Sequence, residues 1–221
     1  NNQGIDKVLK RVIKSSPTGV IGINIGANRE SENRIEDYIK VLEKSNPYFD
    51  FATINISSPN TPNLRNLQNT HNLKELLSAV CEKNNSFSRP TKIFLKIDPD
   101  MNFKKLEEIM DISIKFNLAG LIATNTTVSR NNLNSEYKNQ QGGLSGKPLF
   151  LLSTKKLAEL FSISSGIIPL IGVGGIFSAE DAYEKIKAGA SALQIYTAIG
   201  YHGMEIIEEI VRKLDYLLEK D

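Results

Sequence analysis

Six short apolar runs, separated by longer stretches with helical periodicity, form the basic pattern of this 221-residue chain. The runs span residues 20–26, 50–56, 92–97, 120–126, 168–174 and 191–197. In the stretches between them, apolar residues recur three and four positions apart, as at Leu73, Leu76, Leu77 and Val80, which is typical of amphipathic helices. The pattern therefore predicts strands and helices that alternate along the whole chain.

The predicted strands are apolar nearly throughout and do not alternate with polar residues, so we expect both faces of each strand to be buried. Burial on both faces is typical of a parallel sheet that is covered by helices. Regular alternation of strand and helix then leaves two architectures, a doubly wound sheet or a (β/α) barrel.

The residues that follow the strands favour the barrel. A doubly wound sheet concentrates its binding groups at one switch point, whereas a barrel collects them from all of its strands around one mouth. Here every predicted strand ends in small or polar residues: Asn24 and Gly26, Asn55 to Ser58, Lys96 and Asp98, Thr124 to Thr127, Gly174 and Gly175, and Tyr196 and Thr197. We therefore expect an α/β fold, a (β/α)8 TIM barrel.

The number of strands falls short of a closed barrel. A sheet of six strands would leave two open edges, which natural folds avoid. We therefore expect residues 1–221 to be a single barrel domain that supplies about six βα units and is incomplete at its N-terminus.

Composition narrows the classes of function. The formal net charge of +2 gives no electrostatic argument for a nucleic-acid partner. The single cysteine, Cys81, excludes an internal disulfide. The only histidines are His71, in a polar loop, and His202, which we place at a helix start. Without a carboxylate cluster or a Cys/His spacing, we predict no metal site and no Ser-His-Asp triad.

Glycine-rich turns give a candidate phosphate site. Gly174 and Gly175 end a predicted strand just before a helix, where backbone N–H groups can approach an anion and the helix dipole favours negative charge. Barrels often bind phosphate after their last two strands. The last two strands predicted here end at Gly174–Gly175 and within "ALQIYTAIGYHG" (192–203). Gly146, in "GGLSGKPL", offers a third such turn. The alternative is that the glycines only make tight turns.

Lys96 and a set of asparagines are the remaining candidates. Lys96 lies among apolar residues in "IFLKID", where it either extends to solvent at the barrel rim or places positive charge against a flavin. The carboxamides complement the edge of a pyrimidine, although an Asn in a turn is the ordinary alternative; they are Asn24, Asn55, Asn60 and Asn125. A phosphate-binding, amide-lined pocket with one lysine suits a flavin better than it suits a hydrolase.

Six motifs in this order carry a resemblance to a known family: "INISSPNTPNLR", "KID", "IATNTT", "GGLSGKPL", "IGVGGI" and "QIYTA". The sequence resembles dihydroorotate dehydrogenase, in particular the quinone-dependent, membrane-associated branch (class 2). Soluble relatives carry cysteine where this chain has Ser58, so the serine points to the quinone-dependent branch.

The resemblance implies an FMN cofactor, oxidation of dihydroorotate to orotate in pyrimidine synthesis, and reoxidation of the flavin by a ubiquinone-type quinone. It also implies membrane association through an N-terminal segment that precedes this chain. The implied location is the mitochondrial inner membrane, or the inner membrane of a bacterium.

Residue by residue, the resemblance makes Ser58 the catalytic base. Asn24, Asn55, Lys96 and Thr124 would contact the flavin ring and ribityl chain. Gly146, Gly175, Tyr196 and Thr197 would hold the phosphate. Asn55, Asn60, Asn125 and Thr126 would hold the pyrimidine.

The sequence departs from the family pattern at two positions. Ala27 stands where lysine is usual and Asn63 where glycine is common, and we expect Asn63 to adopt a left-handed turn conformation. The long polar connections 59–70 and 129–141 are expected to cover the site as a lid, with ordinary surface loops as the alternative.

Two other enzymatic functions remain open, beside that of a non-catalytic binding fragment. One is a phosphate-binding barrel with isomerase or lyase chemistry. The other is a flavin-dependent tRNA dihydrouridine synthase, which the near-neutral charge disfavours.

Overall fold

The computed structural model describes residues 3–131 and 133–220. These residues form a six-stranded sheet whose strands are all parallel and whose neighbours follow chain order. The strands are β1 (Gly22–Ile25), β2 (Phe51–Asn55), β3 (Lys92–Ile97), β4 (Gly120–Ala123), β5 (Leu170–Val173) and β6 (Ala192–Gln194). The six predicted strands are therefore confirmed, although most are shorter than the apolar runs that predicted them.

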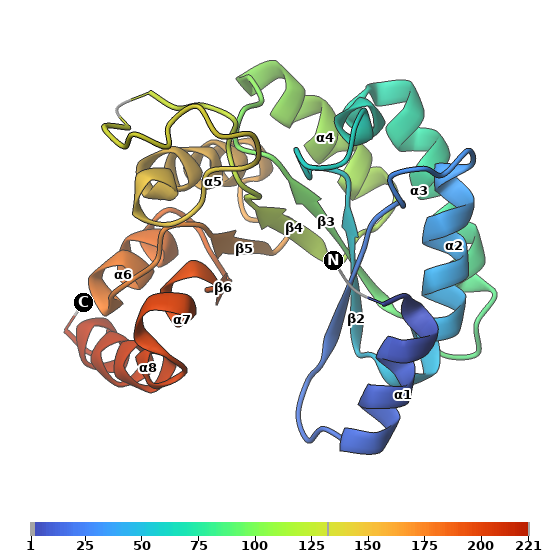
Figure 1. Cartoon of the computed structure of the whole chain (residues 1–221), viewed down its shortest axis with the longest axis horizontal. Coiled ribbons are helices and arrows are strands. Elements are labelled where there is room, and N and C mark those ends of the chain that lie inside the picture. The colour runs from blue at the N-terminus through green and yellow to red at the C-terminus, as the bar shows by residue number, and fades with distance from the viewer. Residues whose placement is uncertain (1–2, 132, 221) are drawn as a thin grey trace.

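Helices line the convex side of the sheet (Figure 1); among those described, five connect successive strands, one precedes β1 and two follow β6. They are α1 (Ile5–Ser15), α2 (Arg34–Ser45), α3 (Thr70–Asn85), α4 (Phe103–Lys115), α5 (Phe150–Ser164), α6 (Ala179–Lys187), α7 (Thr197–His202) and α8 (Glu205–Leu218). Short 3-10 turns occur at Asn46–Tyr48, Leu64–Gln68 and Lys147–Leu149. This arrangement is the wall of a (β/α) barrel, as the sequence predicted.

The two faces of the sheet differ in their burial. Ile54, Leu95 and Leu121 are register partners in neighbouring strands, and all three are fully buried in the main hydrophobic core on the helix side. Each buried leucine contributes roughly 1.5–3 kcal/mol through the area it removes from water. The opposite, concave face carries Asn55 and Lys96, which are register partners of each other and are only partly buried. The expectation of burial on both faces therefore holds throughout β4 but is wrong for β1, β3 and β6.

The sheet is open between β1 and β6 (Figure 1). Among the described residues these two strands each have one strand neighbour, while the four inner strands have two. The six strands thus form part of a barrel wall and leave the concave face accessible. The carboxyl ends of all six strands lie at one rim of this face because the strands are parallel.

The end of the sixth strand differs from the prediction. Tyr196 and Thr197 were expected to end the strand, but Tyr196 is the N-cap of α7 and Thr197 is its first residue. His202 was expected at a helix start and instead ends α7, because Gly203 follows with a φ of 74° that a helix cannot continue. Asn63 has a φ of 57°, which confirms the expected left-handed turn.

Candidate functional site

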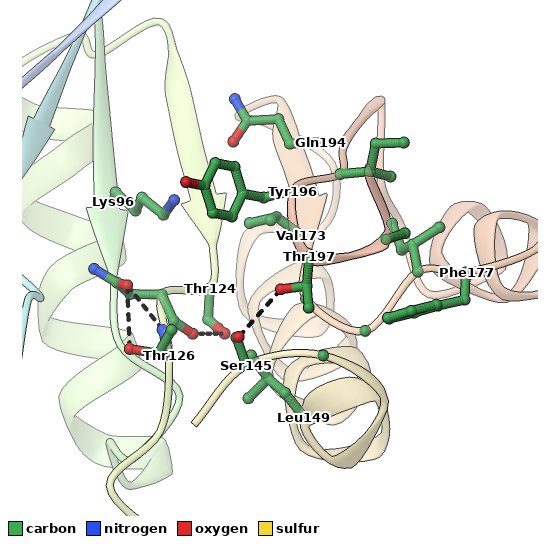
Figure 2. Close-up of a pocket in the computed structure, with 17 residues that line it drawn as sticks. Lys96, Thr124, Thr126, Ser145, Leu149, Val173, Phe177, Gln194, Tyr196 and Thr197 are labelled. Atoms are coloured by element: carbon green, nitrogen blue, oxygen red, sulfur yellow. Dashed lines mark hydrogen bonds between the residues drawn. The ribbon is translucent and has the colours of Figure 1, made fainter. Parts of the chain in front are cut away.

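A cavity of about 240 Å³ lies at the carboxyl ends of β3 to β6 (Figure 2). It collects most of the residues that the sequence assigned to a flavin site, together with Asn125 and Thr126 from the pyrimidine set. These lining residues are Lys96, Thr124, Asn125, Thr126, Gly146, Gly175, Tyr196 and Thr197. Segments that are about one hundred residues apart in the chain therefore meet here, which is the arrangement that a shared ligand requires.

One end of the cavity is made of glycine-rich backbone. Gly146 and Gly175 have φ values of 76° and 78°, a conformation that side chains disfavour. A Cβ on Gly175 would also lie 2.6 Å from Cα of Phe150, so only glycine fits there. Beside them, Thr197 Oγ1 donates to Ser145 Oγ over 3.1 Å.

Backbone donors at this end are available for a ligand. Within the described chain, the N–H groups of Gly146 and Gly175 donate to no other residue. The first turn of α6, in contrast, is already capped: Ser178 accepts from the N–H of Asp181 over 3.2 Å, and Asp181 accepts from the N–H of Phe177 over 2.8 Å. An anion seat here is therefore built from the two loop amides and nearby hydroxyls, and not from the start of α6.

Lys96 lies on the wall of the cavity, on β3. Its side chain points toward Tyr196, which reaches the cavity from the other side (Figure 2). Burial lowers the pKa of Lys96, and no hydrogen bond or ion pair satisfies its ammonium within residues 3–131 and 133–220. A partly buried cation without a partner is stabilised by a ligand that offers acceptor atoms.

Next to Lys96, three side chains at the carboxyl ends of β2 and β4 form a hydrogen-bonded cluster. Ser57 Oγ donates to Asn55 Oδ1 over 2.9 Å, and Asn125 Nδ2 donates to Ser57 Oγ over 3.0 Å. Tyr38, fully buried on α2, donates its hydroxyl to the Asn55 carbonyl over 2.8 Å. The carboxamides of Asn55 and Asn125 are thus held in fixed orientations at the rim.

Ser58 and Asn60 lie next to this cluster but do not line the cavity. Ser58 Oγ accepts from the N–H of Asn60 over 3.3 Å, so the two are held together in one turn. A Cβ on Gly142 would lie 3.5 Å from Asn60 Oδ1, which places this turn against the loop after β4. Asn24 is in a separate hollow between β1, α1 and α2, so the structure does not bring it to the cavity.

Arg65 fastens the loops after β2 and β4 to each other. Its guanidinium donates to the carbonyls of Ser57 and Thr126, over 3.3 Å in each case. It also donates to Asp100 over 2.9 Å and lies 3.6 Å from Asp98. Burial raises the pKa of Asp98, and the adjacent Arg65 charge opposes that rise. The loops after β2 and β4 therefore share one cation.

The long connection after β4 is closed at its base. Thr127 and Leu144 form an antiparallel bridge with N–H···O distances of 3.2 and 2.8 Å. Arg130 donates to the Gly142 carbonyl over 2.6 Å and to the Thr127 carbonyl over 3.1 Å. Thr126 and Gly143 are held in contact by this clasp.

Ser57, Arg65 and Tyr38 were not assigned a role from the sequence. Ser57 has the same strand parity as Asn55, and that spacing could have revealed it. Arg65 and Tyr38 act through contacts with distant segments, for which the local sequence carries no signal.

Residues 3–131 and 133–220 contain no group of three or more His, Cys, Asp or Glu side chains placed to hold a metal ion. In the same residues, no helix combines the length and apolar character needed to cross a membrane.

The fold and the cavity define this chain as part of a (β/α)-barrel protein with its ligand site at the carboxyl ends of the strands. The dihydroorotate dehydrogenase family model matches residues 1–218, and the chain belongs to that family. This confirms the resemblance recognised in the sequence.

The relatives point to the quinone-dependent branch. Dihydroorotate dehydrogenase (quinone) of Cereibacter sphaeroides is 46% identical over 223 residues, which cover 100% of this chain and 63% of the relative. The enzyme of the same name from Christiangramia forsetii is 46% identical over 216 residues, covering 97% of this chain and 63% of the relative. The chain thus spans less than two thirds of the length of these curated relatives.

Solved structures agree with the fold. The crystal structure of the Eimeria tenella dihydroorotate dehydrogenase in complex with ferulenol superposes with a TM-score of 0.94 at 32% identity. The match covers 100% of this chain and 66% of that one. The ligand-free Eimeria tenella structure superposes with a TM-score of 0.92 and is covered to 68%.

Proposed function

We propose that the protein to which this chain belongs is an FMN-dependent dihydroorotate dehydrogenase that oxidises dihydroorotate to orotate and passes the electrons to a ubiquinone-type quinone. The observation that carries the proposal is the cavity itself. Lys96, which has no partner among the described residues, and the fixed carboxamide of Asn125 line one end, and the N–H groups of Gly146 and Gly175, which donate to no described residue, line the other. The family membership supports this reaction over isomerase or lyase chemistry and over action on tRNA.

The residues fit FMN in three ways. The N–H groups of Gly146 and Gly175, with Thr197 and the backbone at Tyr196, match the phosphoryl end. Lys96 offers a cation to the ring system, where positive charge favours the reduced flavin. Thr124 and Asn55 lie beside Lys96 and offer hydroxyl and amide groups to the ring and ribityl chain. Asn24 joins this set only by resemblance, because it lies outside the cavity.

The pyrimidine would be held on the substrate side of the flavin by four residues, Asn55, Asn60, Asn125 and Thr126. The carboxamides of Asn55 and Asn125 are pre-oriented by Ser57, and Tyr38 holds the backbone of Asn55, so binding loses little side-chain entropy. Asn60 shares its turn with Ser58, so substrate contacts and the base would be positioned together.

Ser58 is the proposed base that removes the proton from C5 of dihydroorotate. When bound, FMN supplies the hydride acceptor for C6. A serine hydroxyl is a weak base, so it has to pass the proton on to a hydrogen-bonded water or hydroxyl. The hydroxyl of Ser58 already accepts a hydrogen bond from Asn60, which fixes its direction. Positioning therefore supplies much of the rate enhancement.

We further propose that the protein associates with a membrane through a part that lies outside residues 1–221. This follows from the use of quinone, which resides in membranes. We propose the mitochondrial inner membrane, with a bacterial inner membrane as the alternative. Fractionation of cells that express the full-length protein, followed by a salt wash of the membranes, tests the association.

The visible spectrum of full-length protein tests the activity. Bound FMN gives an absorption band that dihydroorotate should bleach without oxygen, and a soluble quinone should restore the band. A colourless protein would refute the cofactor, and a yellow protein that dihydroorotate fails to bleach would refute the substrate. Salt-dependent RNA binding would instead support the tRNA-modifying alternative.

A further inference from the structure

Lys185, on α6, is a fully buried lysine that the proposed chemistry does not use. Its ammonium donates to Ser153 Oγ over 2.6 Å and lies 5.1 Å from the centre of the Phe150 ring. Removing an ammonium from water is unfavourable, and an apolar side chain of similar length would fill the same space without that penalty. The position therefore points to a use for the charge beyond packing.

The contacts of Ser153 show where that charge acts. Ser153 Oγ lies 3.0 Å from the carbonyl oxygen of Gly174, so one hydroxyl joins Lys185 to the glycine turn after β5. Phe150, under the lysine, also packs against Gly175, where a Cβ would collide with its backbone. Lys185 is thus linked to Gly174 and Gly175 through Ser153 and Phe150, and it does not itself line the cavity.

We propose that Lys185 is a positioning residue for the phosphate seat: through Ser153 it fixes the Gly174–Gly175 turn, and it supplies positive charge behind the amides that receive the phosphoryl group. This inference rests on the proposed function, because it assigns the phosphoryl end of FMN to this turn. Lys185 does not touch the ligand and acts through the turn.

The electrostatics are consistent with this role. Burial lowers the pKa of Lys185 to about 7, while the carboxylate of Asp181, one turn earlier on α6, opposes the shift. A phosphate dianion seated at the turn would favour the protonated lysine in the same way as Asp181 does. Lysine and dianion therefore stabilise each other in an interior that screens charges poorly.

The test compares FMN with riboflavin, which has the same ring and ribityl chain but no phosphate. Full-length protein prepared free of flavin is titrated with each ligand, and binding is followed by quenching of flavin fluorescence. For Lys185→Met, we expect FMN affinity to fall roughly ten- to a hundredfold, less than for a direct contact between a cation and a dianion, because Lys185 acts on the phosphate only across the turn. Riboflavin affinity should stay unchanged.

Lys187→Met is the matched control. Lys187 is on the same helix, two residues further on, but its side chain is 53% exposed and pairs with Glu184 on the surface. The control should leave both affinities unchanged. Ser153→Ala keeps the lysine and removes the link to Gly174, so it should lower the ratio of FMN to riboflavin affinity in the same direction by a smaller factor.

The outcomes separate this inference from the proposed function. An unchanged ratio in a folded Lys185→Met variant, or an equal loss for both ligands, overturns the inference. If Lys185→Met does not fold, Ser153→Ala decides by the same criterion. Wild-type protein that binds FMN no more tightly than riboflavin overturns the phosphate seat itself, and with it the proposed cofactor site.

Discussion

Replacing Arg65 tests how strongly one cation ties together the loops after β2 and β4. In Arg65→Met the hydrogen bond to Asp100 and the two bonds to the carbonyls of Ser57 and Thr126 are lost. Hydrogen bonds to charged groups contribute about 1.5–3 kcal/mol each when well formed, and the two at 3.3 Å should contribute less. Asp98, buried and without its neighbour, adds a further penalty.

These terms add to a loss of roughly 3–5 kcal/mol in the free energy of unfolding, after allowing for the partial exposure of the guanidinium. Arg65→Lys keeps the charge but cannot form the fork of bonds, so about half of the loss should remain. Urea unfolding of the full-length protein, followed by circular dichroism, measures both variants. Arg89→Met is the control, because the Arg89 side chain is 89% exposed and lies 3.9 Å from Asp50.

The pH dependence adds a second, independent readout. Burial already raises the pKa of Asp98, and removing Arg65 raises it further. A carboxyl with a raised folded-state pKa destabilises the protein when it is ionised, and this penalty disappears as the pH falls through that pKa. The loss in Arg65→Met should therefore be smaller at pH 5 than at pH 8. A loss below about 1 kcal/mol, or the same loss at both pH values, would refute the clamp.

Three further predictions concern single positions. Ser58→Ala should slow flavin reduction by dihydroorotate about 10²–10⁴-fold in anaerobic stopped-flow measurements while FMN stays bound; loss of FMN would show that the role of Ser58 is wrong. Burial lowers the pKa of Lys185 to about 7 in the folded chain, whereas the unfolded chain has the ordinary pKa of 10.5. Between these pH values the Lys185 amine is therefore protonated in the unfolded chain but largely neutral in the folded one. The unfolding free energy of flavin-free protein should therefore rise with pH there, by up to about 1.4 kcal/mol per unit, and Lys185→Met should lack this slope; equal slopes would contradict the burial argument. Gly175→Ala should lower the melting temperature and FMN affinity because of its φ of 78° and the contact with Phe150. Gly200→Ala, in α7 with no atom within 4 Å of the added Cβ, should be neutral or stabilising, and a similar loss in both variants would refute the steric explanation.

Much of the fold could be predicted because its signals are local. Apolar runs and helical spacing depend on neighbouring residues, so the six strands and the helices between them followed from the sequence. The exact strand ends did not follow, because hydrogen bonding between strands decides where pairing stops. The short α7 was missed because its six residues contain too few turns for a periodic pattern.

The candidate site was predictable where its residues follow strands directly. Lys96, Thr124 and Asn125 come from the ends of strands, and parallel pairing brings such ends together. Asn24 also follows this rule but belongs to β1, at the open edge of the sheet, and lies away from the cavity. Arg65 and Lys185 were not predicted, since each has a partner more than thirty residues away in the chain.

Thr127, Leu144 and Arg130 form a clasp that closes the connecting segment at its base. The geometry of the base therefore does not depend on how long the segment is. Entropy of loop closure changes slowly with the number of residues enclosed, by about 0.6 kcal/mol for each doubling. The span between Arg130 and Gly142 could therefore lengthen, shorten or carry a grafted peptide while Asn125 and Gly146 keep their places. A change in the length of this span therefore need not disturb the residues proposed to bind the ligand.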